Sequence, residues 1–374
     1  MKQAYIYSIL LACSGQACSD GNTNAEVKVC DFEVSSMIEL GSPNIIDIDY
    51  SAISRSVIAI TDDGINSVIT IEADNSAMFV HAFYEESVYD DNNDKAVAWQ
   101  PNATRIAVGR TGTPSNIVTR RVDLENAKVE KERWSNASPT TAVDWTFDGQ
   151  FAVAGGITSE GLNWSGLYLL KPGPTRGVLV DAELTINESI FALKCSPTEF
   201  LILAAGEFST SIFGIDDQGQ LEHHYSEQLT REVKRNNGLS TFRKAVNPVL
   251  TWSPDGKEAI YASAEIDRND TAVDQVSLLR IENKKFSVIQ NRTSVTWKPQ
   301  TADWNKENNI VAIASSDPAA IFLLNPSTLN PIATLNLEEP PSAAYWLGQN
   351  NDLIVSSGNQ LMILKPGCLS DPAQ

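Results

Sequence analysis

Three aspartates each stand directly before a large aromatic residue. They are Asp49, Asp144 and Asp303, in the stretches "IIDIDYS", "AVDWTF" and "TADWNK". Carboxylates gathered at one place can bind a cation or a polar ligand in a protein channel. A single aspartate can instead accept hydrogen bonds from the backbone of a neighbouring element. The residue types fit both roles. Which role applies depends on how the surrounding elements position the three aspartates.

Metal ligands are scarce in this sequence. The chain has three histidines, His81, His223 and His224, and contains neither a Cys-x-x-Cys pair nor a His-Glu-x-x-His motif. His223 and His224 are adjacent, so on a strand they would point to opposite faces. The stretches "DDNNDKAVAWQP" from Asp90 and "DRNDTAVDQ" from Asp267 begin like calcium loops but lack the glycine and glutamate that such loops need. We expect solvated loops there, with no metal and no cofactor.

Nucleophilic catalysis finds little support. No Gly-x-Ser-x-Gly motif is present, and three histidines leave few candidates for a catalytic base. Cys195 replaces a core aromatic residue in the repeat described below, which is typical of a small buried side chain. Catalysis by a pair of carboxylates, as in glycosidases, remains an alternative, because a sequence does not show which acids lie close together in space. We therefore name no catalytic residue.

One long connection carries a concentration of positive charge. The stretch "DDQGQLEHHYSEQLTREVKRNNGLSTFRKAVNP" contains the basic residues Arg231, Lys234, Arg235, Arg243 and Lys244. Such a patch can dock an acidic partner or lipid headgroups, and a long connection with a solvated face is the alternative. Within it we expect a helix over about residues 226–235.

The elements that must position these residues form a repeat. Its clearest copy is "VLTWSPDGKEAIYASAE" at residues 249–265: an apolar strand ending at an aromatic anchor, a turn, and a second apolar strand. The turn contains Ser, Pro, Asp and Gly, which favour turns for different backbone reasons. Seven such units occur, 42 to 57 residues apart, with anchors at Tyr50, Trp99, Trp145, Cys195, Trp252, Trp304 and Trp346.

This period, with several short strands per unit, predicts an all-β, seven-bladed β-propeller. A four-stranded blade has two apolar faces, and stacking blades in a ring covers both. The seventh unit lacks a fourth strand, while an unassigned strand, "VKVCDFEVSSMIEL" at residues 27–40, precedes the first unit. We expect the N-terminal strand to pair with the last blade and close the ring.

The cysteine positions fit this closure. Cys30 opens the N-terminal strand and Cys368 follows the last one, so antiparallel pairing would bring them together. In an exported protein a Cys30–Cys368 disulfide is expected, and the chain-entropy model gives it at most about 4–5 kcal/mol. Two free thiols remain the alternative, because Cys18 can pair with either residue.

The "SPDG" turns and their strands resemble the WD40-like repeat of TolB-type propellers. This sequence differs from strict WD40 repeats, since no Gly-His opens the units and no Trp-Asp closes them. It differs from TolB because there is no room for an N-terminal α/β domain before Tyr50. The resemblance implies a propeller over most of the chain and leaves the activity open, because propellers host many functions.

The N-terminus resembles a bacterial lipoprotein signal. One lysine precedes an apolar run over residues 4–12, and Leu10-Leu11-Ala12-Cys13 matches a lipobox. The resemblance implies a signal peptide at 1–12, a lipidated Cys13, and an outer membrane location facing the periplasm or the surface, since Ser14 replaces the aspartate of inner-membrane retention. An ordinary signal peptide cleaved nearby is the alternative. Residues 13–27 then form a flexible tether, 28–368 the propeller and 369–374 a tail.

Charge narrows the range of partners. The chain has 28 basic and 47 acidic residues, a net charge of −19 that repels nucleic acid. We interpret the protein as an exported, lipid-anchored scaffold at the cell envelope that binds an envelope protein or a small ligand through its loops and channel mouth. The alternative is a propeller hydrolase or lactonase with a carboxylate or metal site at the central channel. The lack of a complete metal or nucleophile motif favours the scaffold over the enzyme.

Overall fold

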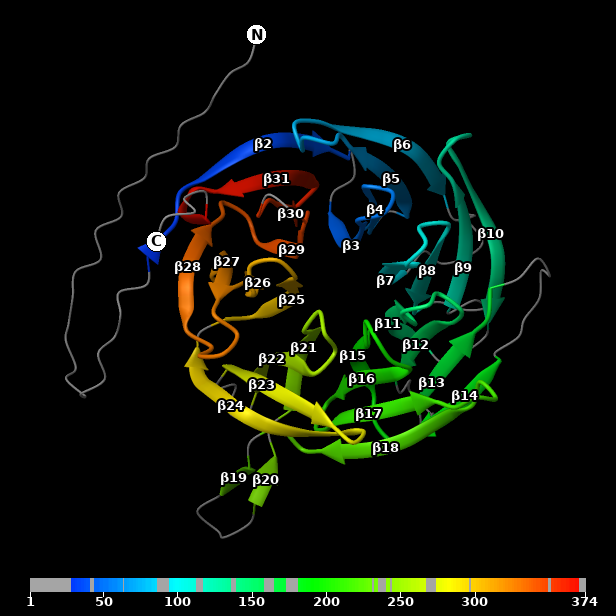
Figure 1. Ribbon diagram of the computed structural model, residues 1–374, viewed down its shortest axis with the longest axis vertical. Coiled ribbons are helices and arrows are strands. Elements are labelled where there is room, and N and C mark those ends of the chain that lie inside the picture. Colours follow the sequence, from blue (N-terminus) through cyan, green and yellow to red (C-terminus); the bar gives the residue numbers. More distant parts are fainter. Residues whose placement is uncertain are drawn as a thin grey trace.

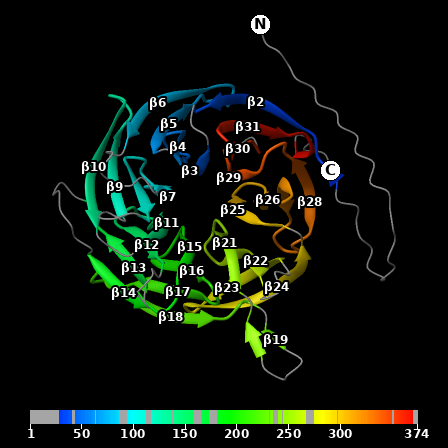
Figure 2. The same cartoon turned by 180° about the vertical axis from the view of Figure 1, so that it is seen from behind.

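Seven β-sheets stand around a central channel in the computed structural model of the chain (Figure 1). The structure describes residues 28–40, 44–62, 64–85, 94–111, 117–135, 139–157, 165–172, 181–230, 232–234, 240–242, 244–266, 274–295, 297–348 and 351–369. The signal peptide at 1–12, Cys13, the tether at 13–27 and tail residues 370–374 lie outside these ranges. Figure 2 shows the same ring from behind. The predicted all-β, seven-bladed fold is confirmed.

Each of the first four blades is one antiparallel sheet whose strands follow one another from the channel outward. Blade 1 contains β3 (Ile45–Ser51), β4 (Ser56–Thr61), β5 (Ile65–Ile71) and β6 (Met78–Glu85). Blade 2 contains β7 (Asp94–Trp99), β8 (Arg105–Arg110), β9 (Ile117–Asp123) and β10 (Lys128–Ser135). Blade 3 contains β11 (Thr140–Trp145), β12 (Ala152–Gly156), β13 (Ser165–Leu170) and β14 (Ala182–Ile186). Blade 4 contains β15 (Ile190–Cys195), β16 (Leu201–Gly206), β17 (Thr210–Ile215) and β18 (Leu221–Glu227).

The last three blades complete the circle. Blade 5 contains β21 (Lys244–Trp252), β22 (Glu258–Ile266), β23 (Asp274–Glu282) and β24 (Lys285–Val295). Blade 6 contains β25 (Pro299–Asn305), β26 (Ile310–Ser316), β27 (Ala319–Leu324), β28 (Pro331–Asn336) and the short parallel strand β1 (Lys28–Val29). Blade 7 contains β29 (Pro341–Trp346), β30 (Leu353–Ser357), β31 (Gln360–Pro366) and the N-terminal strand β2 (Phe32–Glu39), and a short 3-10 turn over Gly367–Leu369 follows β31.

The core lies between the blades. Every residue of β4, β12 and β16 is buried, because the second strand of a blade is covered on both faces by its neighbours. The anchors fill the gaps: Trp99 of blade 2 packs with Ile58 and Ile60 of blade 1. The outer strand β18 contains only exposed and half-buried residues instead. In the part of the chain that the structure describes, no helix has the length and apolar character needed to cross a membrane.

The turns between the first and second strands explain the recurring "SPDG" phrase. In blade 5 the Ser253 hydroxyl accepts the Glu258 N–H at 2.9 Å and donates to Asp255 at 2.7 Å. The Asp255 carboxylate accepts the Lys257 N–H, and Gly256 takes a φ of 71°. This left-handed conformation favours glycine because a Cβ atom clashes there. A hydroxyl, a carboxylate and a glycine at fixed offsets therefore define the turn.

We call these seven connections the anchor turns; they span residues 52–55, 100–104, 146–151, 196–200, 253–257, 306–309, and 347–348 with 351–352. Neighbouring anchor turns touch, since the Gln100 side chain donates to the Gly149 carbonyl at 2.6 Å. On the other side of the ring, the Asn308 side chain donates to the Asn351 side chain. The anchor turns consequently form one face of the ring, the anchor-turn face.

Replacing Gly256 by alanine should lower the free energy of unfolding by about 2 kcal/mol. A Cβ atom there would lie 2.3 Å from Thr198 Oγ1 and would also strain the backbone. Gly348 is a matched control, because its φ of 85° is equally left-handed while a Cβ atom would meet nothing within 4 Å. Gly348→Ala should therefore cost about 1 kcal/mol in urea unfolding. Equal losses in the two variants would show that the contact between turns contributes nothing.

The two ends of the chain close the ring. Strand β2 pairs antiparallel with β31, with Phe32 opposite Pro366 and Glu39 opposite Gln360. The predicted closure of the last blade by the N-terminal strand is confirmed. Cys30 and Cys368 form a disulfide with Cα atoms 5.6 Å apart, and Cys30 is buried. The parallel pairing of β1 with β28 was not predicted; it carries the N-terminal segment across from blade 6 to blade 7.

The predicted helix over residues 226–235 is wrong. Residues 221–227 form the outer strand β18, and β19 (Glu232–Lys234) pairs with β20 (Ser240–Phe242) in a hairpin outside the ring (Figure 1). The third strand β17 has an edge whose backbone groups require partners, and β18 supplies them. Sheet pairing therefore overrides the local helical preference of this stretch.

Candidate functional site

The residue before each anchor belongs to a ring around the channel. Side chains alternate along a strand, so on the innermost strand the residue before the anchor points to the opposite face of the blade, toward the following blade at the channel edge. The seven equivalent residues are Asp49, Ala98, Asp144, Lys194, Thr251, Asp303 and Tyr345. Lys194 interacts electrostatically with Asp49, Asp144, Asp303 and Tyr345, as expected of side chains that face one common space.

The three predicted aspartates each accept a hydrogen bond from the next blade. The pairs are Asp49 with the N–H of Trp99 (2.6 Å), Asp144 with that of Cys195 (2.8 Å), and Asp303 with that of Trp346 (2.8 Å). Asp47, which sequence reasoning missed, accepts the Val97 N–H at 3.0 Å in the same way. The three aspartates therefore have a structural role, which was one of the two roles that the sequence allowed.

The anchors also form hydrogen bonds with the preceding blade. Three of their indole N–H groups donate to the carbonyl oxygen of the channel residue one blade back. These bonds run from Trp145 to Ala98 (3.0 Å), from Trp252 to Lys194 (2.9 Å) and from Trp346 to Asp303 (3.2 Å). Adjacent blades are therefore held in register at the channel wall by polar contacts as well as by apolar packing.

Lys194 is the channel cation that sequence reasoning missed. Burial alone disfavours its charged form, but Asp144 and the other channel groups outweigh this and raise the pKa of Lys194 well above its usual value. Its Nζ lies 5.9 Å from the centre of the Tyr345 ring. Aligning the units on their anchors would have revealed Lys194, because it occupies the same position as the three aspartates.

Burial raises the pKa of several acids in the channel. It raises the pKa of Asp47 and the pKa of Asp49 to about 7, against the opposing effects of backbone N–H donors and Lys194. The pKa of Asp303 is raised for the same reason. Burial also raises the pKa of the Cys195 thiol well above its usual value, which disfavours the thiolate that a nucleophile needs. Cys195 is half-buried and packs against the apolar cluster between blades 3 and 4.

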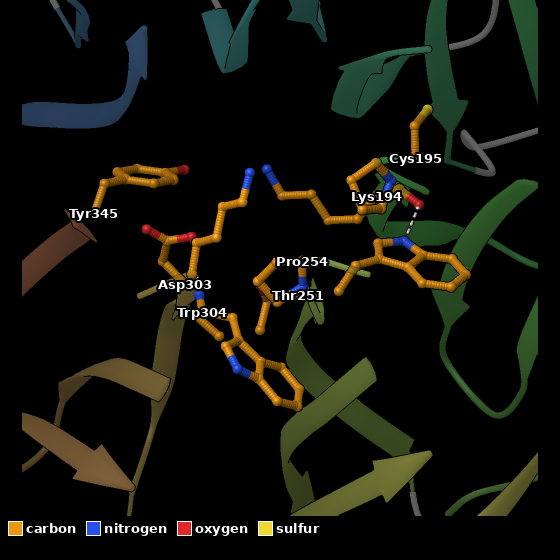
Figure 3. A pocket seen from close by; sticks show the side chains of 11 residues that line it. Lys194, Cys195, Thr251, Pro254, Asp303, Trp304 and Tyr345 are labelled. Carbon is orange, nitrogen blue, oxygen red and sulfur yellow. Dashed lines mark hydrogen bonds between the residues drawn. The ribbon is translucent and has the colours of Figure 1, made fainter. Parts of the chain in front are cut away.

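A cavity of about 260 Å³ opens where the channel meets the anchor-turn face. Blades 4 to 7 line it with the polar residues Lys194, Thr251, Asp303, Lys306 and Tyr345 and with the apolar residues Pro197, Trp252, Pro254, Ala302 and Trp304, together with Cys195. Figure 3 shows the Lys194 side chain extending across the cavity toward Tyr345 and Asp303. The cavity consequently makes Lys194, Thr251, Asp303 and Tyr345 of the ring of channel residues accessible to a ligand from this face.

The other predicted sites lie away from this cavity. Asp94, expected in a solvated calcium-like loop, is instead buried at the start of β7, where it pairs with Arg110 at 2.9 Å and accepts from Asn66. Asp90 and Asp267 are outside the described residues. His223 and His224 lie on the outer strand β18, and His223 contacts Ser226. Among the described residues, no group of three His, Cys, Asp or Glu side chains is arranged to hold a metal ion.

The predicted basic patch is described only in part. Arg231, Arg235 and Arg243 lie outside the described residues, and Lys234 belongs to the hairpin strand β19. Lys244 begins β21, where its Nζ pairs with the Glu207 carboxylate at 2.8 Å and lies above the Phe208 ring. Lys244 is thus already paired with an acid of its own chain.

The fold and the channel define the class of protein: a closed, seven-bladed β-propeller of WD40-like architecture. No protein-family model matches the chain, and no curated protein matches it. Among solved structures, the chain is similar to the crystal structure of the β-propeller domain of Cps50 (Swd1) from Myceliophteria thermophila, with a TM-score of 0.64 and 11% identity over 90% of this chain and 99% of that one. At this identity the likeness shows the fold alone.

Proposed function

We propose that this protein is a non-enzymatic binding scaffold whose contact surface is the anchor-turn face. The observation that carries the proposal is the coincidence, on this face, of a polar cavity and exposed aromatic side chains. Behind them stands a ring held together by bonds between blades, so the face is presented on a rigid support. Rigid scaffolds commonly carry their binding residues on loops.

The aromatic side chains belong to adjacent anchor turns. Phe147 of blade 3 and Phe200 of blade 4 have ring centroids 5.0 Å apart, and each residue is 37% exposed. Pro197, in the same turn as Phe200, lines the cavity. Exposed aromatic residues grouped beside a cavity are typical of protein interfaces. The 196–200 turn therefore contributes both to the cavity wall and to the aromatic pair.

The test is a pull-down from membranes of cells that make the protein naturally. Phe147→Ser with Phe200→Ser should abolish capture of the bound partner, because the aromatic part of the contact area is lost. Phe79→Ser is the matched control, since Phe79 is 54% exposed but lies on the outer strand β6. Undiminished capture by the double variant would refute the assignment of this face.

We also propose that the scaffold is exported and anchored to a membrane by lipid on Cys13. The support is the apolar run over residues 4–12 followed by the lipobox-like Leu10-Leu11-Ala12-Cys13. A structural disulfide, as between Cys30 and Cys368, is typical of proteins that leave the reducing cytosol. Metabolic labelling with a palmitate analogue should mark the wild type and not Cys13→Ser. Equal labelling of both proteins would contradict the lipid anchor.

A further inference from the structure

The cavity wall contains several hydrogen-bond donors that have no acceptor in the described part of the chain. They are Lys194 Nζ, Lys306 Nζ, Thr251 Oγ1 and Tyr345 Oη, which form no hydrogen bond or ion pair with any described residue. Thr251 is only 6% exposed, so the protein covers most of its surface. These four groups come from four different blades and converge on one space.

Two carboxylates near this space, Asp303 on the cavity wall and Asp144 beside Lys194, each accept two backbone hydrogen bonds. Asp303 accepts the N–H of Trp304 at 3.0 Å with one carboxylate oxygen and that of Trp346 at 2.8 Å with the other. Asp144 accepts the N–H groups of Trp145 and Cys195 in the same manner. The four donors named above, two of them ammonium groups, can pair with an anionic acceptor that enters the cavity.

The rest of the cavity indicates the kind of molecule that carries the acceptor. Pro197, Pro254 and the indole of Trp304 form an apolar wall beside the donors. The volume of about 260 Å³ lies just below the ~300–1,000 Å³ of ordinary ligand pockets, so it suits one small acid or one inserted side chain. A carboxylate on a short apolar body matches both the donors and this wall.

We propose that the cavity binds a carboxylate carried on a small apolar group, with Lys194, Thr251, Tyr345 and Lys306 donating to its oxygens. The inference rests on the proposed binding function and gives its chemistry. The carboxylate comes from a free organic acid or from an acidic side chain of a bound partner, since both present the same group. The carboxylate enters from the anchor-turn face, which also carries the exposed Phe147 and Phe200.

Isothermal titration of the wild-type protein tests this with matched pairs of probes. For a free acid the pair is 3-phenylpropionate and 3-phenylpropionamide, and for a side chain it is acetyl-Phe-Asp-amide and acetyl-Phe-Asn-amide. In at least one pair the acid should bind about tenfold or more tightly than the neutral amide, the effect of one charge-assisted hydrogen bond. The pair with the higher affinity identifies the source of the carboxylate. Equal affinity of acid and amide in both pairs would overturn the proposal.

Variants locate the bound acid. Lys306→Met should weaken binding by about fivefold and the isosteric Thr251→Val by about threefold, each through loss of one donor. Lys257→Met is the matched control, because Lys257 is an exposed lysine of the neighbouring anchor turn that pairs with Asp255 and does not line the cavity. It should change the affinity by less than about twofold. If Lys257→Met weakened binding of the acid as much as Lys306→Met, the effect would come from the net charge of the protein, and the proposed site would be wrong.

The two proposals fail separately. If neither acid binds but the double variant at Phe147 and Phe200 still loses its partner, the binding face is supported and carboxylate binding in the cavity is refuted. If the acid binds and responds to Lys306→Met while the partner is captured without the aromatic pair, the cavity stands and the face is wrong.

Discussion

Replacing Cys30 by serine is expected to lower the free energy of unfolding by about 4–5 kcal/mol under oxidising conditions. The disulfide to Cys368 spans 338 residues, so it removes a large amount of conformational freedom from the unfolded chain. It also joins the start of β2 to the end of β31, the two strands that close the ring. Urea unfolding followed by tryptophan fluorescence measures the loss.

Four controls distinguish the loss of the disulfide from the loss of a buried thiol. Cys368→Ser and the double variant should each match Cys30→Ser, since one bond is broken in all three. Addition of a reductant should lower the stability of the wild type to the same value. Cys195→Ser, which removes the one free cysteine among the described residues, should change the free energy of unfolding by about 1 kcal/mol or less. Peptide mapping without reduction should recover Cys30 linked to Cys368. A loss below about 1 kcal/mol in Cys30→Ser would show that the termini stay closed without the bond.

Replacing Lys194 by methionine is expected to lower the free energy of unfolding by about 3 kcal/mol at pH 8. The side chains have similar length, so packing is largely kept while the ammonium is lost. Asp49, Asp144 and Asp303 then face one another without the cation that compensates them. Lys306→Met, which removes an exposed lysine of the same cavity, should change stability by less than about 1 kcal/mol.

The pH dependence separates lost charge from lost packing. In the wild type the pKa of Asp47 and the pKa of Asp49 are about 7 in the folded state, against 3.8 for an ordinary aspartate. The folded state therefore binds protons more readily than the unfolded state between these values, and these two groups make the protein less stable as the pH rises from about 4 to above 7.

Loss of the Lys194 cation raises the pKa of both carboxyls further, because Lys194 lowers them in the wild type. The Lys194→Met variant should consequently lose less stability at pH 5, where Asp47 and Asp49 are protonated, than at pH 8. Urea unfolding of both proteins at the two pH values measures this difference. The same loss at pH 5 and pH 8 would mean that the lysine acts through packing and not through its charge.

The architecture was predictable because blade stacking imposes a repeating chemistry. An anchor such as Trp252 and a turn such as Ser253-Pro254-Asp255-Gly256 satisfy local requirements that recur in every blade. Counting the anchors gave the number of blades, and the missing fourth strand of the last unit indicated where the N-terminal strand pairs. The two-residue parallel strand β1 has no sequence pattern, since so short a pairing depends on the neighbouring edge alone.

The site was predictable only in part. Asp49, Asp144 and Asp303 were recognised from their place before the anchors, but their hydrogen bonds to the next blade depend on how the blades are set side by side. Lys194 and Tyr345 also stand directly before an anchor. They were missed because sequence reasoning compared residue types and not positions in the repeat. The pairing of Phe147 with Phe200 joins two turns of different repeats, which only the closed ring brings together.

Site-specific photo-crosslinking in cells that make the protein naturally tests the binding face most directly. A photoreactive phenylalanine analogue replaces Phe200 on the anchor-turn face or, as the control, Phe79 on the outer strand β6. We predict a discrete crosslinked partner from position 200 that is absent from position 79. A partner captured at position 79 and not at position 200 would contradict the account, because it would place the contact on the rim of the ring.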